Sequence, residues 1–274
     1  MKLISLLFFF VYSIHFINAQ LIFENAKNKE ISFKSNISVW NVDELQNLYL
    51  IQGTTIVKCD SSGKELFSQS IKFIGEVSQI EPINALKIAV FSEEQQCLCL
   101  FDNTLSLNGK CKYFEEFGIK NAKLIASSNR PNLFWVYDQF NSSLFLIDII
   151  SNKLVQKVEN IKGQFFKGKT EIDVEKIIEY DNHLYLSNSE EKILEFDQLM
   201  TLSGEYRKHA RNFSFLEKQL VEIGKDTIWI TSLLNNEVKN YNNENKNIQE
   251  FKIKGKKFYF SSENKLSIFT IKID

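Results

Sequence analysis

The sequence predicts an all-β fold, a β-propeller of about six four-stranded blades. Three observations lead to this prediction. Short apolar runs typical of strands recur along the chain, their best-defined motif returns about every 40 to 50 residues, and almost no segment has the 3.6-residue rhythm of a helix. Several strands in a period of this length are typical of propeller blades, whereas helical repeats of similar length would show helical periodicity.

The recurring motif is an apolar strand that ends in an aromatic or apolar residue followed by Asp or Asn. Another β-rich run lies ten to thirteen residues before each motif, so each pair predicts a β-hairpin. The motif occurs as IVKCD, LCLFD, LFLID, ILEFD and VKNYN, which end at Asp60, Asp102, Asp148, Asp197 and Asn242, and in degenerate form as LSIFT, which ends at Thr270. The upstream runs cover residues 47–52, 87–91, 133–138, 183–188, 227–232 and 257–262.

Some units agree beyond this motif. FDNTLSLNGK (101–110) and FDQLMTLSGE (196–205) share Phe-Asp, a later Leu and a Gly at the same offsets, and Trp135 and Trp229 both lie thirteen residues before the end of their motif. We therefore align these units as equivalent blades. We interpret the recurrent Asp mainly as structural, because a carboxylate at a strand end can accept backbone N–H bonds and shape the turn.

Two segments could be short helices, DVEKIIEY (173–180) and FSFLEKQL (213–220). Both precede a β-rich run, where a propeller places its innermost strand, so we interpret them as strand or loop. The last unit is short. We expect its missing outer strand to come from LIFENAKNKEISF (21–33), which would close the ring and leave no long sheet edge open.

This repeat style resembles the NHL- and YWTD-type propellers, and more closely the uncharacterised secreted bacterial proteins built from similar repeats, with NALKIAVFSEEQQCLCLFDNTLS (84–106) as the most typical stretch. The resemblance covers nearly all of the chain after its leader, and its motifs specify strands rather than chemistry. Glycine and proline are sparser than in standard NHL repeats. Such families contain ligand binders, scaffolds and a few hydrolases or lyases, so the resemblance does not choose among them.

The first residues are typical of a secretory signal. Lys2 precedes an apolar run from Leu3 to Ile17, and cleavage is expected after Ala19. The run is too short for a membrane span, and a retained anchor is the minority reading. We therefore expect residues 1–19 to be a signal peptide, residues 20–274 to be one propeller domain, and the mature protein to be secreted or periplasmic, in the cell envelope, with no stable membrane span.

Charge gives little information on partners. Lys plus Arg (33) and Asp plus Glu (34) nearly cancel, so we expect no nucleic-acid partner, and we expect a monomer that binds a protein or glycan. No histidine pair with metal-ligand spacing, nucleophile elbow or phosphate-binding glycine loop occurs. We therefore predict no catalytic residue, cofactor or metal site.

The four cysteines leave two readings open. Cys97 and Cys99 lie on one face of a strand but lack a second pair for a zinc site, which argues against metal. If the hairpin turns around Leu105, Cys99 faces Cys111 across neighbouring strands, close to bridging distance. A disulfide between Cys99 and Cys111 and four buried free thiols are equally favoured, with Cys59 at a core position in either case.

Candidate ligand contacts are the polar residues where β-rich runs approach loops at the mouth of the ring. These are Tyr137, Asp138, His183 and Asn188. The first functional hypothesis is an exported, non-catalytic propeller that serves as a binding or scaffold module. The alternative is an extracellular propeller hydrolase or lyase that acts on a polymer or ester, with His183 and acidic groups at the mouth.

Overall fold

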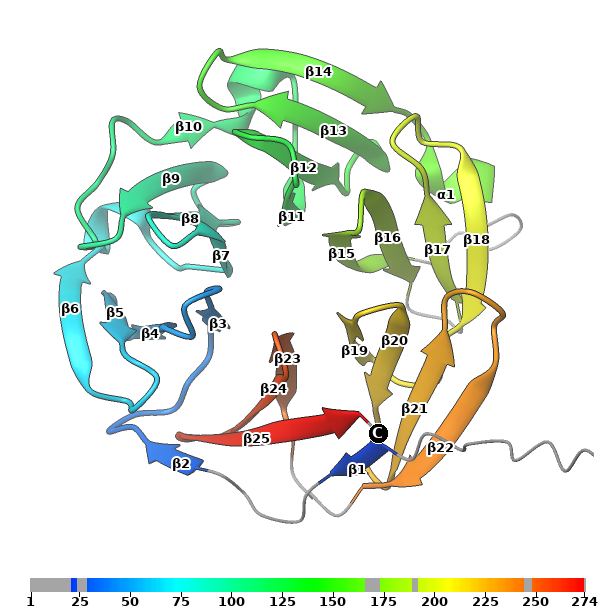
Figure 1. Cartoon of the computed structure of the whole chain (residues 1–274). Coiled ribbons are helices and arrows are strands. Elements are labelled where there is room, and N and C mark those ends of the chain that lie inside the picture. The colour runs from blue at the N-terminus through cyan, green and yellow to red at the C-terminus, as the bar shows by residue number, and fades with distance from the viewer. Residues whose placement is uncertain (1–20, 24–28, 166–172, 189–191, 244–247, 274) are drawn as a thin grey trace, which may run out of the picture.

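A computed structural model describes residues 21–23, 29–165, 173–188, 192–243 and 248–273. The predicted leader and its cleavage site lie outside these residues. Within them the chain forms six antiparallel sheets arranged as blades around a central axis, which confirms the predicted six-bladed β-propeller (Figure 1). No helix in this part of the chain is long and apolar enough to cross a membrane.

Each blade runs outward from its innermost strand in sequence order. Blade 1 contains β3 (Trp40–Val42), β4 (Leu48–Gln52), β5 (Thr55–Cys59) and β6 (Glu65–Ser70); blade 2 contains β7 (Gln79–Asn84), β8 (Lys87–Ser92), β9 (Cys97–Asp102) and β10 (Lys112–Tyr113); blade 3 contains β11 (Ala122–Ser127), β12 (Leu133–Asp138), β13 (Ser143–Asp148) and β14 (Lys153–Val158). Blade 4 contains β15 (Val174–Tyr180), β16 (His183–Asn188), β17 (Lys192–Phe196) and β18 (Leu202–Arg207); blade 5 contains β19 (Asn212–Leu216), β20 (Gln219–Ile223), β21 (Thr227–Ser232) and β22 (Val238–Asn242). Blade 6 contains β23 (Glu250–Lys254), β24 (Lys257–Ser262) and β25 (Lys265–Ile273), and the only helices described are short: η1 (Lys72–Ile74), η2 (Phe114–Phe117) and α1 (Ile161–Phe165).

The middle strands of a blade are apolar on both faces because both faces are covered by neighbouring blades. In β12, Phe134 and Val136 belong to the core cluster shared with blade 2, whereas Trp135 and Tyr137 belong to the cluster shared with blade 4. Successive side chains of a strand point to opposite faces, so a strand buried on both sides needs an almost continuous apolar run. The hairpins that the sequence predicts are mostly these second and third strands.

The N-terminal segment closes the ring. β2 (Lys29–Ser32) pairs with β25 in antiparallel register, and β1 (Leu21–Phe23) pairs further along the same strand. The expected closure by residues 21–33 is therefore confirmed. Ile31 is buried in the core between blades 6 and 1, and it packs so closely on the turn at Gly63 that a Cβ there would lie 2.5 Å from the Ile31 side chain.

Both segments with helical rhythm are strands, as the repeat indicated. Residues 174–180 form β15, and FSFLEKQL divides into β19 and the first residues of β20, which are joined by the two-residue turn Glu217–Lys218. Both β15 and β19 are innermost strands.

One detail of the predicted repeat is wrong. Trp135 lies in the second strand of its blade, but Trp229 lies in the third strand, β21, and Asn242 ends the fourth strand rather than the third. The units were misaligned because only four residues connect β18 to β19, whereas eight or more connect the earlier blades to one another. Blade 5 therefore begins early, and its outer hairpin lies at the spacing expected for its middle hairpin. The true end of its third strand, Ser232, carries a hydroxyl instead of the recurrent carboxylate.

The structural reading of the recurrent Asp is confirmed. Each carboxylate accepts two backbone N–H bonds from the turn that follows its strand: Asp60 from Ser62 and Lys64 at 2.7 and 3.0 Å, and Asp102 from Thr104 and Ser106 at 2.8 and 2.9 Å. Asp148 and Asp197 bind their turns in the same way. A hydrogen bond from the Ser62 side chain lowers the carboxyl pKa of Asp60, and one from the Thr104 side chain lowers that of Asp102, with the backbone bonds adding to both shifts. The backbone bond from Ser151 is the main cause of the lowered pKa of Asp148, since each of these bonds favours the charged form.

Cys99 and Cys111 are joined by a disulfide, whereas Cys59 and Cys97 are buried free thiols. The strand register agrees with the predicted hairpin. Lys112 pairs with Leu98 in antiparallel order, so Cys111, which precedes Lys112, faces Cys99, which follows Leu98. Leu105 lies in the turn with a φ of 66°.

A thiol count should detect this bridge. Denatured, unreduced protein should react with a thiol reagent at Cys59 and Cys97 only, and at all four cysteines after reduction. Peptide mapping of the unreduced protein provides the check, and a peptide that links Cys97 or Cys59 to another cysteine would contradict the pairing.

The closing strand should be important for stability. We expect Ile31→Ala to lower the free energy of unfolding by about 2–4 kcal/mol, because it leaves a cavity under the last strand pair of the ring. Its neighbour Glu30 points to solvent and makes a surface ion pair with Lys265, so Glu30→Ala should cost less than about 1 kcal/mol. Chemical denaturation of both variants measures this, and equal losses would contradict a special role for Ile31.

Candidate functional site: the central channel and one face of the ring

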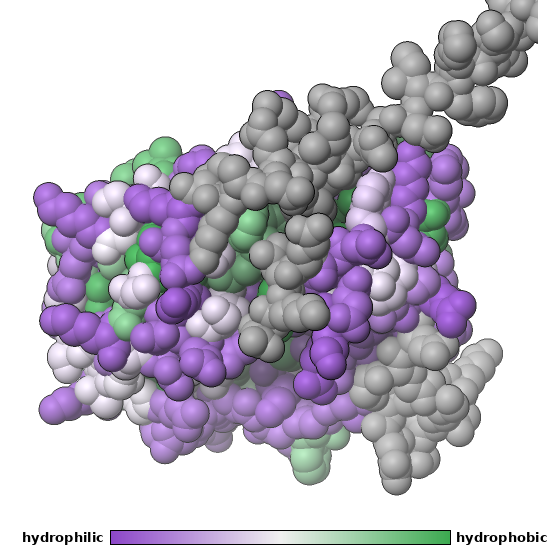
Figure 2. Space-filling view, turned by 90° about the horizontal axis from the view of Figure 1, so that it is seen from below, coloured by the Kyte–Doolittle hydropathy of each residue, from purple (hydrophilic) through white to green (hydrophobic). Residues whose placement is uncertain are grey.

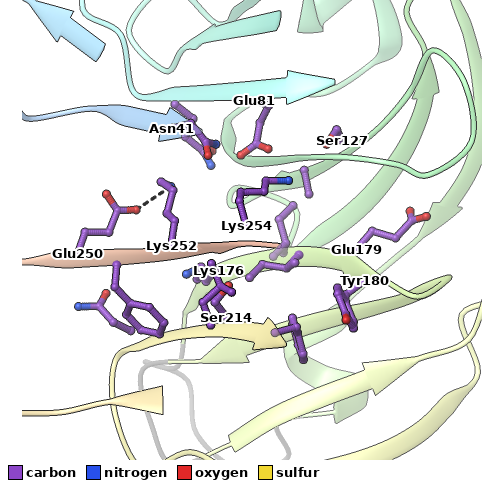
Figure 3. A pocket seen from close by; sticks show the side chains of 18 of the residues that line it. Asn41, Glu81, Ser127, Lys176, Glu179, Tyr180, Ser214, Glu250, Lys252 and Lys254 are labelled. Atoms are coloured by element: carbon purple, nitrogen blue, oxygen red, sulfur yellow. Dashed lines mark hydrogen bonds and ion pairs between the residues drawn. The ribbon is translucent and has the colours of Figure 1, made fainter. Parts of the chain in front are cut away.

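The six innermost strands surround a central channel with a volume of about 1230 Å³ (Figures 1 and 3). Its wall comes from β3, β7, β11, β15, β19 and β23 and from the residues at their ends. Glu44, Glu217 and Lys256, which lie in turns after innermost strands, also line it, so the channel reaches the face of the ring where those turns emerge. No histidine or cysteine occurs among the described residues of the wall.

Each innermost strand has one edge without a strand partner, and polar side chains satisfy part of that edge. Asn41 donates its side-chain amide to the Ile80 carbonyl at 2.6 Å, which connects blade 1 to blade 2. Gln79 accepts the Ile125 N–H at 2.8 Å, and Asn212 donates to the Gln249 carbonyl at 2.9 Å. These bonds replace the ladder that another strand would have supplied, so much of the channel's polarity is structural.

Oppositely charged side chains converge in the middle of the channel (Figure 3). Lys252 donates to Glu250 at 2.9 Å on the same strand, and Lys254 donates to Glu44 of blade 1 at 2.7 Å. Lys176 donates to the Phe213 carbonyl at 2.7 Å. The cations are therefore held by fixed partners rather than left free.

The Glu81 carboxylate differs from these groups because it has no hydrogen-bonded partner among the described residues, and Lys252 and Lys254 act on it only through their charge. It points into the channel from β7, opposite Lys254 (Figure 3). Although its side chain is only half-buried, the channel wall surrounds it, and this burial raises its carboxyl pKa against the opposing influence of Lys252 and Lys254. Burial, followed by the charge of Lys252, lowers the pKa of Lys176 to about 8.

The four residues predicted at the mouth do not line the channel. Tyr137 is buried and its hydroxyl lies 3.2 Å from Asp173, while Asp138 is buried and accepts backbone N–H bonds, including the one from Phe140 in the turn after β12. Asn188 is buried at the end of β16.

His183 begins the same strand, β16, that Asn188 ends, so the two lie at opposite faces of the ring, roughly 17 Å apart at about 3.3 Å per residue. The His183 ring lies 3.6 Å from Glu195 and 3.0 Å from the Asp181 carbonyl oxygen. The predicted residues are thus not brought together, and a role for them in ligand contact stays a prediction.

The channel residues were not predicted because the innermost strands mix polar and apolar residues and lack the continuous apolar runs of the second and third strands. The signal that could have found them is alternation. Glu250, Lys252 and Lys254 occupy every second position of β23, as Gln79 and Glu81 do in β7, and every second residue of a strand shares a face.

A second feature lies on the face where the turns after the first and third strands of each blade emerge, which we call the hairpin-tip face. These turns share one face because the first and third strands of an antiparallel blade run in the same direction. Five of the most exposed large apolar side chains lie in these turns, one each in blades 1 to 5: Leu45 (66%), Leu86 (64%), Ile150 (59%), Leu199 (82%) and Leu234 (80%).

The surface seen in Figure 2, edge-on to the ring, is mostly hydrophilic, and hydrophobic residues occur there in small separate groups. On the face opposite to the hairpin tips, the exposed large aromatic residues among those described are Phe73 (58%) and Phe140 (69%). The hairpin-tip face therefore presents more of the highly exposed apolar side chains than the opposite face does.

Comparisons with known proteins agree on the fold. No protein-family model matches the sequence, and no curated protein matches it either. Virginiamycin B lyase from Staphylococcus aureus is similar in structure, with a TM-score of 0.60 and 12% identity over 88% of this chain and 98% of the lyase. The Neurospora crassa Pan2 WD40 domain has a TM-score of 0.59 and 7% identity over 86% of this chain and 89% of that domain.

BamB from Moraxella catarrhalis has a TM-score of 0.50 and 9% identity, covering 88% of this chain and 74% of BamB. A chain of the mitotic checkpoint complex has a TM-score of 0.63 and 6% identity over 98% of both chains. At sequence identities this low, structural similarity establishes only the fold class, a β-propeller. They neither distinguish an NHL or YWTD propeller from other types nor assign an activity.

The channel lysine gives a measurable prediction. With its pKa lowered to about 8, the Lys176 amine should be charged below about pH 8 and neutral above it, whereas exposed lysines stay charged to about pH 10. A pH titration of 13C-lysine-labelled protein by NMR should show one early-titrating resonance that is absent in Lys176→Arg. Glu81→Gln should lower that pKa further, because the Glu81 charge raises it. An unchanged Lys176 pKa in Glu81→Gln would contradict the predicted influence of the Glu81 carboxylate on the Lys176 amine.

Proposed function

We propose that this protein is an exported, non-catalytic propeller that binds a partner protein across its hairpin-tip face. The observation that carries the proposal is the set of exposed apolar side chains, Leu45, Leu86, Ile150, Leu199 and Leu234, at one face of the ring. Single exposed apolar residues are common on protein surfaces, and what supports an interaction surface here is that five of the most exposed ones lie on the same face of the ring.

The turns hold these side chains outward. The backbone N–H of Leu86 donates to Asn84 at 2.8 Å, and that of Leu199 donates to Asp197 at 2.9 Å. Ile150 is bound to Asp148 in the same way at 2.9 Å. Each apolar residue thus follows a turn-forming polar residue by two positions, and its direction is fixed before a partner arrives, which reduces the entropy lost on binding.

A protein suits this face better than a glycan. Isolated leucine and isoleucine tips fit into apolar pockets of another protein surface, whereas sugars are usually gripped by aromatic faces and hydrogen-bonding groups. The similarity to a chain of the mitotic checkpoint complex also supports a role in a protein assembly. Export is supported by the N-terminal sequence, typical of a signal peptide, and by the disulfide between Cys99 and Cys111, a bond typical of oxidising compartments.

The enzyme alternative has weaker support. Virginiamycin B lyase has a known catalytically inactive variant in which a histidine is replaced by alanine, and that variant was solved with Quinupristin. The described wall of the channel in this chain contains no histidine, and His183 lies beside one carboxylate, Glu195, outside it. Turnover of a polymer or ester that His183→Ala abolishes would replace the binding proposal.

The test compares two faces of the same molecule. Immobilised wild type, the tip variant Leu199→Glu/Leu234→Glu and the opposite-face variant Phe73→Glu/Phe140→Glu are incubated with envelope extract, and retained proteins are quantified by mass spectrometry. We expect one protein to be retained equally by wild type and the opposite-face variant and about tenfold less by the tip variant, since charges replace two anchors that would each be worth at least 1 kcal/mol.

Equal retention by all three forms, or loss of retention only in the opposite-face variant, would refute the proposal that the hairpin-tip face binds the partner. Retention that a free glycan abolishes would show a sugar partner instead.

The proposed export has its own test. The N-terminus of the exported protein should be Gln20, and an exported chain that keeps Lys2 would refute the proposed cleavage.

A further inference from the structure

The central channel contains two charged side chains whose charge no other described side chain neutralises directly. The other charges in its middle are paired. The Lys252 amine lies 2.9 Å from the Glu250 carboxylate, and the Lys254 amine lies 2.7 Å from the Glu44 carboxylate. Each of these pairs is neutral overall, so together they add little net charge to the middle of the channel. Two charges of opposite sign remain.

The remaining charges belong to Lys176 on β15 and Glu81 on β7. The Lys176 amine donates to the Phe213 carbonyl at 2.7 Å and lies 4.9 Å from the centre of the Phe213 ring, and both of these groups are neutral. An ammonium has three N–H donors, so Lys176 keeps donors for another acceptor. The Glu81 carboxylate has no hydrogen-bonded partner among the described residues, so its acceptor positions are open to a donor in the channel.

Lys176 and Glu81 face the channel from different sides. They come from blades 4 and 2, which are separated by blade 3, and both side chains point into the cavity (Figure 3). Each acts on the pKa of the other through its charge, but no ion pair joins the two. The channel has a volume of about 1230 Å³, and sites for small molecules commonly measure about 300–1,000 Å³. A small molecule can therefore lie between the two groups.

We propose that the middle of the channel binds a small zwitterion, a molecule with one carboxylate and one ammonium group such as a free α-amino acid. Its carboxylate accepts a hydrogen bond from Lys176, and its ammonium donates to Glu81. Both hydrogen bonds are charge-assisted and so belong to the stronger class. This site is separate from the hairpin-tip face and does not rest on the binding of a partner protein.

The signs of the two groups select the ligand. A simple anion would bind Lys176 but meet the negative charge of Glu81, and a simple amine would bind Glu81 but meet the positive charge of Lys176. Either ligand leaves one charge of the channel without a partner, which costs free energy in a partly buried site. A zwitterion satisfies both groups, and because it is neutral overall it leaves the net charge of the channel unchanged.

The ligand can enter from the hairpin-tip face. Glu44, Glu217 and Lys256 lie at this end of the channel, so the entrance carries both signs of charge and repels neither end of a zwitterion. Apolar side chains also line the wall, among them Pro82 and Leu124, and these can contact the carbon chain of the ligand. The channel thus offers both an entry path and the mixture of apolar and polar contacts that a small-molecule site needs.

The test is a binding measurement by isothermal titration calorimetry on the mature protein, with each of the common L-amino acids as a probe. We expect at least one of them to bind with one molecule per chain and a Kd below about 1 mM. The deaminated and decarboxylated analogues of that amino acid should bind at least about tenfold more weakly, because each loses one of the two charge-assisted hydrogen bonds. This comparison uses wild type alone, so it does not depend on how well a variant folds.

Variants locate the site in the channel. Glu81→Gln and Lys176→Met should each weaken binding of that amino acid at least about tenfold. Lys256→Met is the matched control and should bind as wild type does, because it removes a positive charge from the entrance of the channel but touches neither proposed contact. The tip variant Leu199→Glu/Leu234→Glu should also bind the amino acid normally, so loss of the partner protein and loss of the amino acid can be told apart.

Several results would overturn the proposal. They are the absence of any probe with a Kd below about 1 mM, a singly charged analogue that binds as tightly as the amino acid, and equal loss of affinity in Lys256→Met and Glu81→Gln. The bound amino acid should in addition raise the pKa of the Lys176 amine in the NMR titration, since a nearby carboxylate favours the charged form. An unchanged Lys176 pKa at saturating amino acid would contradict the proposed contact.

Discussion

Every blade of this ring must bury two apolar faces, and the rest of the structure depends on that constraint. A sheet with one apolar face can be covered by a single layer, but β12, with Trp135 on one side and Phe134 on the other, needs a neighbour on each side. Burial contributes about 25 cal/mol per Å² of apolar surface, and an isolated blade would leave both of its faces in water. A linear stack would have the same problem at both ends, so closure into a ring is the solution that leaves no face open.

Closure has a cost at the centre. Six innermost strands meet around the axis, and each has an edge with unpaired backbone groups. Side chains such as Asn41 and Gln79 bind the edge of the next blade, which joins the blades from inside and makes the channel polar. A polar channel in a propeller is therefore not by itself a sign of a ligand. Glu81 stands out because the edge bonds and the fixed ion pairs leave it without a partner among the described residues.

The predictability of each part follows from how many of its faces are buried. The second and third strands are buried on both sides, so their sequences are distinctive, and the hairpins, the closing strand and the turn-forming Asp residues could be predicted. The innermost strands are buried on one side only, and their mixed composition hid both their boundaries and the channel residues. The misaligned Trp229 has another origin: only four residues connect β18 to β19, so the outer hairpin of blade 5 lies at nearly the spacing expected for its middle hairpin.

Candidate site residues were harder to predict for a different reason. Tyr137, Asp138 and Asn188 were chosen as polar residues near strand ends, but a strand end in a tightly packed ring is often itself buried, and its polar groups are used to shape turns. Exposure and direction, which separate Leu199 from Asp138, depend on the neighbouring blades and cannot be read from local sequence. The disulfide between Cys99 and Cys111 was left as one of two readings, because choosing it requires the strand register that the folded hairpin supplies.

The pairing of β2 with β25 also determines when this protein can finish folding. Lys29 lies opposite Ile268, so β2 cannot pair until the chain has been made as far as β25. Contacts between residues so far apart in sequence form slowly, because the chain must lose most of its freedom before they bring any gain. Blades 1 to 5 consist of local hairpins and can assemble early. Until β25 is in place, however, the ring is open and an apolar blade face stays exposed at each of its two ends. A chain with this topology can close its ring only after β25 has been made and is free to pair with β2.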